Sequence, residues 1–237
     1  TSKAIGGAIY NYGSADIGNI TGDFIANYAK SEAGSAQGGA IVNENADISN
    51  IAGDFIGNYT FSTTNKALGG AIYNYDSASI TNITGNFIEN YAKSVDGSVQ
   101  GGAILNQGSY IENIFANFIG NSASTENNNA SGGAIYNDET SGNITGDFIG
   151  NYAKSGGDSA SGGAIYNTYG DMGQISGDFV GNYVMSDKWA EGGAIYNERN
   201  SSIDGIKGDF INNYATSTQK GATGGAIYNR DDSEIGD

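Results

Sequence analysis

The chain has 237 residues, with 26 Asp and Glu against 10 Lys and Arg, which gives a net charge of −16. This charge repels nucleic acid and anionic membrane surfaces, so neither is an expected partner. Cys, His and Pro are absent, which excludes disulfides, thiol nucleophiles, and histidine ligands or general bases. No apolar run approaches ~18 residues and no signal-peptide pattern opens the sequence, so no membrane insertion of this segment is expected.

The chain consists of repeats. The quartet Gly-Gly-Ala-Ile begins at Gly6, Gly38, Gly69, Gly101, Gly132, Gly162, Gly192 and Gly224. A second motif, Phe-Ile-x-Asn or once Phe-Val-x-Asn, begins at Phe24, Phe55, Phe87, Phe118, Phe148, Phe179 and Phe210. Composition does not shift along the array and no linker interrupts it. Residues 1–237 are therefore predicted to form a single elongated repeat array.

The elements of one repeat follow in order from the reference copy, residues 6–37. Isoleucine occupies the position of Ile9 in every copy and, further along, that of Ile20 in every copy that reaches it. In residues 144–149, apolar and polar residues alternate with period two, which is typical of a strand with one buried face. Glycine and β-branched residues at these positions disfavour a helix.

A single repeat cannot fold alone. Burying Ile9, Ile17, Ile20 and Phe24 contributes roughly 6 to 12 kcal/mol, whereas ordering about 31 backbones costs roughly 1 to 2 kcal/mol per residue. Stacked repeats supply the missing contacts and main-chain hydrogen bonds. The predicted fold class is therefore all-β: a single-stranded parallel β-helix (β-solenoid), right-handed, with about 31 residues per turn and a core ~35 Å long.

Asparagine marks two corners of this solenoid. It occupies the positions of Asn11 and Asn27 in every copy. Stacked amides form ladders and tolerate left-handed backbone, which suits a turn; binding of a polar ligand by these amides is the alternative. The connection from the Asn27 position to the next Gly-Gly and that from Asn11 to Ile20 are both expected to be exposed, because length or composition varies there. The near-fixed length of the first suggests a loop that is partly tied to the body.

Tyrosine occupies two further columns, which are expected to stack: Tyr10, Tyr73, Tyr136, Tyr166, Tyr196 and Tyr228, then Tyr28, Tyr59, Tyr91, Tyr152, Tyr183 and Tyr214. Val42 and Leu105 interrupt the first column, so packing is the favoured role there; an adhesive face for glycans or neighbouring rods is the alternative. The column of Ile25 points away from Phe24 by parity, and we expect a loop or another molecule to cover it.

The paired GGA[I/L/V] and FxxN motifs resemble those of the chlamydial polymorphic outer-membrane proteins and related bacterial autotransporter passengers. The match covers essentially the whole chain. The resemblance implies a secreted β-helix displayed on the bacterial cell surface, associated with the outer membrane, which acts as an adhesin and is exported through a carboxy-terminal barrel. It also implies a structural motif, with Gly6 and Gly7 at a tight corner and Phe24 in the core.

An acidic column is the main candidate for chemistry: Asp23, Asp54, Asn86, Asn117, Asp147, Asp178 and Asp209. These acids follow the repeat, whereas catalytic groups on a solenoid should break it, so an enzyme is not expected; a polysaccharide-acting β-helix enzyme is the less favoured reading. Hydration of the column is favoured over bridging cations, and no catalytic, cofactor or metal residues are predicted. The irregular Thr21 column argues against ice binding.

Two functions remain in competition. One is a surface or extracellular adhesive β-solenoid with a glycan or a host or neighbouring-cell ligand; the other is an architectural, self-assembling filament subunit without a ligand. Trp189, the one tryptophan, is the most irregular loop residue. Ordinary repeats reach both ends of the sequence without polar capping turns, so we expect self-association along the axis, as part of a longer rod or fibre.

Overall fold

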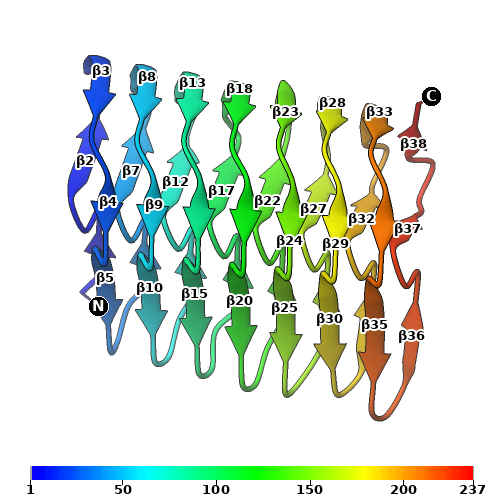
Figure 1. Ribbon diagram of the computed structural model, residues 1–237. Coiled ribbons are helices and arrows are strands. Elements are labelled where there is room, and N and C mark those ends of the chain that lie inside the picture. Colours follow the sequence, from blue (N-terminus) through cyan, green and yellow to red (C-terminus); the bar gives the residue numbers. More distant parts are fainter. Residues whose placement is uncertain (1, 237) are drawn as a thin grey trace.

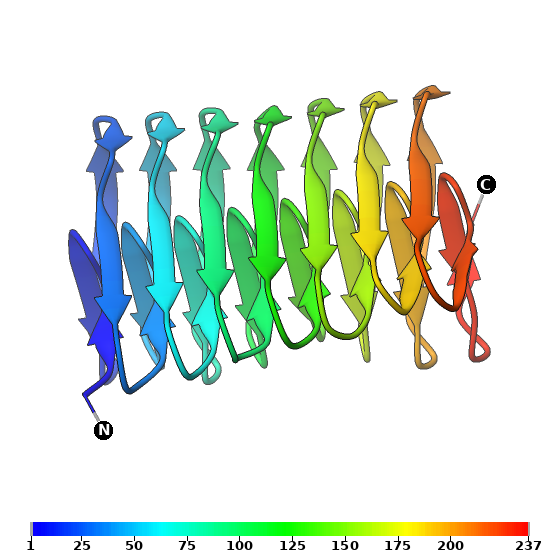
Figure 2. The same ribbon diagram turned by 90° about the horizontal axis from the view of Figure 1, so that it is seen from below.

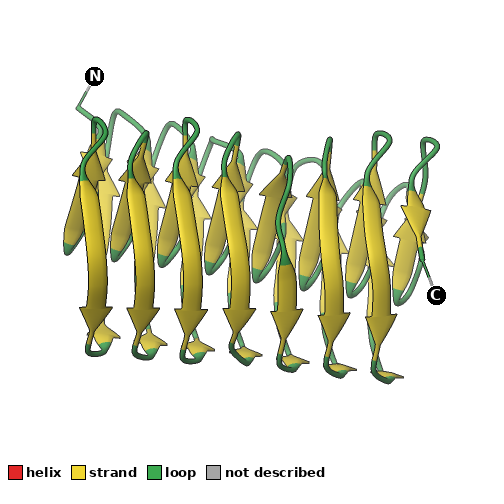
Figure 3. Cartoon of the chain, turned by 90° about the horizontal axis from the view of Figure 1, so that it is seen from above, coloured by secondary structure: helices red, strands yellow, loops and turns green. Residues whose placement is uncertain are grey.

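A computed structural model describes residues 2–236, which form a parallel β-solenoid (Figure 1). Thirty-eight strands, β1 to β38, lie in five parallel sheets that run the length of the molecule. Seen from below and from above, successive turns lie side by side along one axis, with the two ends of the chain at opposite ends of the rod (Figures 2 and 3). The predicted fold class, a parallel β-solenoid, is confirmed.

Three sheets enclose the larger core, and their strands follow in chain order. The first contains β2 (Ile9–Tyr12), β7 (Ile41–Glu44), β12 (Ile72–Tyr75), β17 (Ile104–Gln107), β22 (Ile135–Asp138), β27 (Ile165–Thr168), β32 (Ile195–Glu198) and β37 (Ile227–Asn229). The second contains β3 (Asp16–Thr21), β8 (Asp47–Ala52), β13 (Ser79–Thr84), β18 (Tyr110–Phe115), β23 (Asn143–Thr145), β28 (Asp171–Ser176), β33 (Ser202–Lys207) and β38 (Glu234–Ile235). The third contains β4 (Phe24–Ile25), β9 (Phe55–Ile56), β14 (Phe87–Ile88), β19 (Phe118–Ile119), β24 (Phe148–Ile149), β29 (Phe179–Val180) and β34 (Phe210–Ile211).

Two sheets enclose a smaller core. One contains β5 (Tyr28–Ser31), β10 (Tyr59–Ser62), β15 (Tyr91–Ser94), β20 (Ser122–Thr125), β25 (Tyr152–Ser155), β30 (Tyr183–Ser186) and β35 (Tyr214–Ser217). The other contains β1 (Ala4–Ile5), β6 (Ala36–Gln37), β11 (Ala67–Leu68), β16 (Val99–Gln100), β21 (Ala130–Ser131), β26 (Ala160–Ser161), β31 (Trp189–Glu191) and β36 (Gly221–Thr223). Alanine and valine dominate this core, so the two sheets approach closely.

The larger core is a stack of identical side chains. The isoleucine columns of Ile9 and Ile20 and the phenylalanine column of Phe24 point inward, as predicted. The seven phenylalanine rings, from Phe24 to Phe210, form one unbroken ladder in which neighbouring centroids lie 4.7 to 4.9 Å apart. This distance equals the strand spacing, so the main-chain hydrogen bonds and the ring stacking impose the same repeat.

The two glycines of each quartet have different roles. Gly6 has a φ of +58°, which is left-handed backbone. Gly7 has no room for a side chain: a Cβ there would lie 2.0 Å from the carbonyl oxygen of Gly39 and 2.7 Å from the backbone nitrogen of Tyr28. Because Gly7 has no side chain, the chain can pass directly against the start of β5. The predicted tight corner at Gly6 and Gly7 is confirmed.

Both asparagine columns form buried amide ladders. Each Nδ2 from Asn11 to Asn197 donates to the Oδ1 of the next turn at 2.8 to 2.9 Å. The Asn27 column bonds in the same way, at 2.9 to 3.0 Å, and its Oδ1 atoms also accept backbone N–H groups. The structural role is confirmed, but the left-handed residue is the one before the Asn27 position, for example Ala26 with φ +53°.

The expected exposed connection between the Asn27 position and the next Gly-Gly is wrong in part. Each turn places two strands there, such as β5 and β6, and Ala29 and Ala36 are buried. Only the residues around Glu32 and Ala33 project as an exposed turn. Ser31 closes this turn, because its hydroxyl accepts the N–H of Gly34 at 2.9 Å. These packed strands explain why the connection hardly varies in length.

The column of Phe148 provides a direct test of the register. Phe148 is fully buried, whereas its neighbour Ile149 is 39% exposed. We expect Phe148→Asp to lower the free energy of unfolding by at least ~3 kcal/mol, because it places a charge in the core and leaves a cavity. Ile149→Asp is the matched control and should cost much less. Urea unfolding of both variants checks this, and equal midpoints would contradict the register.

Candidate functional site

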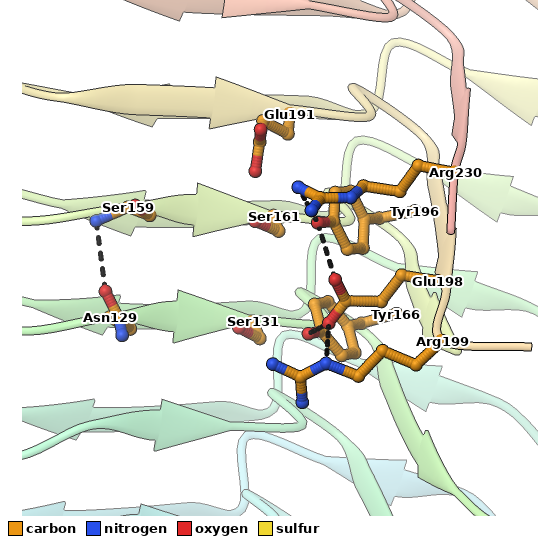
Figure 4. A pocket seen from close by; sticks show the side chains of 10 residues that line it. All are labelled: Asn129, Ser131, Ser159, Ser161, Tyr166, Glu191, Tyr196, Glu198, Arg199 and Arg230. Carbon is orange, nitrogen blue, oxygen red and sulfur yellow. Dashed lines mark hydrogen bonds and ion pairs between the residues drawn. The ribbon is translucent and has the colours of Figure 1, made fainter. Parts of the chain in front are cut away.

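A hollow of about 260 Å³ lies on the surface of the rod, towards its C-terminal end (Figure 4). Strands β26 and β31 contribute Ser161 and Glu191, and β32 contributes Tyr196 and Glu198. The hollow exists because side chains shrink along one column. Along this column, two long side chains are followed by two serines, which leave the neighbouring tyrosine column uncovered; the residues in order are Leu68, Gln100, Ser131 and Ser161.

Glu198 organises this hollow. Its side chain is only 6% exposed and accepts hydrogen bonds from the hydroxyls of Tyr166 and of Tyr196, the latter at 2.9 Å. Arg199 pairs with it, Nε to Oε1 at 3.3 Å. Arg230 extends the network, with its Nη1 at 3.5 Å from the Tyr196 hydroxyl (Figure 4). The hollow therefore contains both arginines of the chain.

The ionisable groups of the hollow are perturbed mainly by burial. Burial, followed by neighbouring tyrosine and Glu198 charges, raises the pKa of Tyr166 far above its ordinary value. Burial also raises the pKa of Glu191, partly offset by the positive charge of Arg230. The hollow therefore presents a carboxyl that takes up a proton more readily than usual, beside guanidinium and phenol donors.

This arrangement is suited to binding a polar molecule. Glycoside hydrolysis needs two carboxyl groups that face the substrate. Here both oxygens of Glu198 are engaged by Tyr166, Tyr196 and Arg199, which leaves Glu191 as the one lining carboxyl free to meet a bound molecule. The lining of serine, tyrosine and arginine offers hydrogen bonds to hydroxyl or carboxylate groups.

The structure gives the acidic column a role that sequence reasoning missed. Each side-chain oxygen accepts the backbone N–H of the next turn: Asp147 Oδ1 binds the N–H of Asp178 at 2.9 Å, and Asp178 Oδ1 that of Asp209 at 2.8 Å. The same bond runs through Asp23, Asp54, Asn86 and Asn117. These residues are structural acceptors as well as hydrated groups, and residues 2–236 contain no group of three or more Asp or Glu placed to hold a metal ion.

The two tyrosine columns differ in environment. The first packs with Val42 and Leu105 in a buried cluster, which confirms the packing role. The second lies on the outer face of β5 and its partners, where Tyr28 is 56% exposed. The Ile25 column points outward as predicted, and Ile25 itself is 60% exposed, so no loop covers it. Trp189, expected in a loop, begins strand β31 and packs over Gly221 rather than lining the hollow.

The sequence did contain a signal for the hollow. Catalytic or binding groups on a solenoid are expected to break the repeat, and Glu191, Arg199 and Arg230 do so. Glu191 is the one glutamate in the column of Ser161, and no other turn has an arginine at the positions of Arg199 and Arg230. Their spatial convergence was not visible, since they are supplied by different strands and turns. None of these residues was predicted as a site residue.

No protein-family model, curated protein or solved structure matches the chain. The resemblance to chlamydial outer-membrane repeats therefore stays a prediction. Residues 2–236 include no helix long and apolar enough to cross a membrane.

The acidic column makes a prediction about metal removal. Because each Asp oxygen is already used by a backbone N–H, a chelator should leave the melting temperature of the protein unchanged within ~2 °C. Thermal unfolding with and without EDTA measures this. A drop of ~10 °C or more would show that cations bridge Asp147, Asp178 and Asp209.

Glu191 makes a prediction about pH. A carboxyl whose pKa is raised by folding binds its proton more tightly in the folded state, so its contribution to stability is present below its ordinary pKa of 4.5 and is lost as pH rises through the raised value. Glu191→Gln removes this loss. We expect the variant to melt above the parent protein at pH 7 and level with it near pH 4. Glu32→Gln, in an exposed turn, is the control with the same change of charge, and an equal gain there would attribute the effect to net charge alone.

Proposed function

We propose that this chain is a structural and adhesive β-solenoid of the bacterial cell surface or extracellular space, forming part of a longer rod or fibre. One observation carries the proposal: every turn makes the same hydrogen bonds and side-chain stacks with the next, so a turn offers a ready surface to another turn of the same kind. The phenylalanine ladder from Phe24 to Phe210 and the amide ladder from Asn11 to Asn229 run without a break through the described residues.

The edge of a turn has hydrogen-bonding groups as well as apolar surface. The N–H groups of Tyr59 and the residues that stack on it donate to the asparagine carbonyl of the preceding turn, as Tyr59 does to Asn27 at 3.0 Å. Tyr28 has no preceding turn within residues 2–236, so its N–H points to an open strand edge. Such an edge pairs readily with another strand.

The acidic surface is compatible with growth along one axis. The net charge of −16 repels parallel rods from one another, whereas the ends offer apolar surface and unpaired backbone. Further repeats of the same polypeptide or a second copy can continue the ladders. In the resembled family such rods mediate attachment, and an architectural filament without a ligand is the alternative function.

End-to-end association is the test of this proposal. The protein should form rods or oligomers whose mass rises with concentration, as measured by light scattering and electron microscopy. Tyr28→Pro removes the edge donor together with the ring that stacks on Tyr59, and it should reduce association. Tyr28→Ala is the control, because it loses the same ring but keeps the N–H, so it should associate like the parent. A monomer of the parent protein at millimolar concentration would disprove the stacking.

A further inference from the structure

The outer face of the sheet that contains β5 is unlike the rest of the acidic surface. Two columns project from it: the second tyrosine column, and the column Lys30, Phe61, Lys93, Ser124, Lys154, Met185 and Thr216. No carboxylate occurs in either column. The face is therefore a neutral to basic strip on a chain of net charge −16.

The polar groups of this strip lack partners within the chain. The hydroxyls of the six tyrosines form no hydrogen bond with other atoms of residues 2–236, whereas Tyr73 of the buried column donates to Gln107 at 2.8 Å. The ammonium groups of Lys93 and Lys154 form no ion pair in the same part of the chain, and Lys30 lies over the ring of Phe61 at 5.5 Å. Donors of both kinds thus remain available to another molecule.

The lysines are spaced regularly. Lys30, Lys93 and Lys154 occupy alternate strands, β5, β15 and β25, so each positive charge follows the last after two strand spacings, roughly 9.6 Å. Two pyranose units of an extended polysaccharide cover about the same length. A sugar chain with one carboxylate on every second unit would place each carboxylate at one lysine.

A hollow interrupts the strip between two of these lysines. It has a volume of about 290 Å³ and is lined by Lys93, Ser124, Thr125, Glu126, Tyr152 and Lys154. It forms because the fourth turn has serine in both columns, Ser122 and Ser124. Tyr152 stacks on Tyr183 with one face, at a centroid distance of 5.0 Å, but has no tyrosine on the other side. That free face is available to a sugar ring, and Glu126 can accept bonds from its hydroxyls.

We propose that this strip binds a linear acidic polysaccharide that carries a carboxylate on every second sugar. It lies along the rod axis with carboxylates at Lys93 and Lys154 and with the neutral sugar between them at the hollow. Nucleic acid does not fit, because a strand carries one charge per ~3.4 Å. An anionic membrane attracts clusters of about 4 to 8 basic residues, whereas this strip has three lysines among acidic neighbours. The inference rests on the attachment part of the proposed function and is independent of axial stacking.

Calorimetry with an octasaccharide of alternating glucuronate and N-acetylglucosamine tests the proposal. We expect binding by the parent protein, and at least a tenfold higher Kd for the double variant Lys93→Ala with Lys154→Ala. Lys66→Ala with Lys207→Ala is the matched control, since it removes the same charge from outside the two columns, at the turn before β11 and at the end of β33, and should leave Kd within twofold. Equal effects of the two pairs, or equal binding of a neutral chito-octasaccharide, would overturn the proposal.

A second variant tests the hollow without weakening the fold. Ser122→Tyr completes the tyrosine ladder between Tyr91 and Tyr152, so the melting temperature should be kept or raised while the Kd rises severalfold. An unchanged Kd would overturn the placement of the sugar at the hollow. If a peptide with Asp at every third residue binds more tightly than the octasaccharide, the polysaccharide proposal is overturned and the ligand is an acidic protein. Octasaccharide binding measured at a protein concentration where light scattering shows only monomer makes a failure of stacking and a failure of sugar binding distinguishable.

Discussion

The parallel stacking of one turn on the next is the constraint on which the rest of this structure depends. Main-chain hydrogen bonds fix successive turns at one strand spacing, so each side chain lies directly above its equivalent. Ring centroids in the phenylalanine ladder are 4.7 to 4.9 Å apart as a result. A residue is therefore acceptable at a position only if it tolerates a copy of itself at that distance, and phenylalanine, isoleucine and asparagine do.

Charge is the property that this constraint penalises most. Two carboxylates one strand spacing apart repel by ~1 kcal/mol in water and ~3.5 kcal/mol at an effective dielectric near 20. The Asp column is tolerated because it is at the surface and because each carboxylate accepts a backbone N–H of the next turn, for example that of Asp178. The lysines of the β5 face avoid the penalty in another way, since Phe61 and Ser124 separate Lys30, Lys93 and Lys154.

The breaks in the repeat have a different physical origin from the repeat itself. Where every turn is alike, the side chains satisfy one another and leave little for a ligand. Where small residues replace large ones, as at Ser161 and Ser124, the short side chains leave a hollow in the surface. Charged and aromatic residues border both hollows, and these are the places where the rod has unused hydrogen-bonding capacity.

The sequence by itself determined the repeat length, the parallel β-solenoid and the inward faces of the Ile9, Ile20 and Phe24 columns. Identical side chains that stack on one another must recur at a fixed spacing in the sequence, and this spacing can be read directly. Only the tertiary structure decided what lies between the motifs. The connection after Asn27 was expected to be a loop and is two strands, since alanine and serine carry no strong strand signal and their burial depends on the opposite sheet. The breaks in the repeat at Glu191, Arg199 and Arg230 could be read from the sequence, but their convergence around Glu198 could not, because strand register and corner geometry bring these residues together.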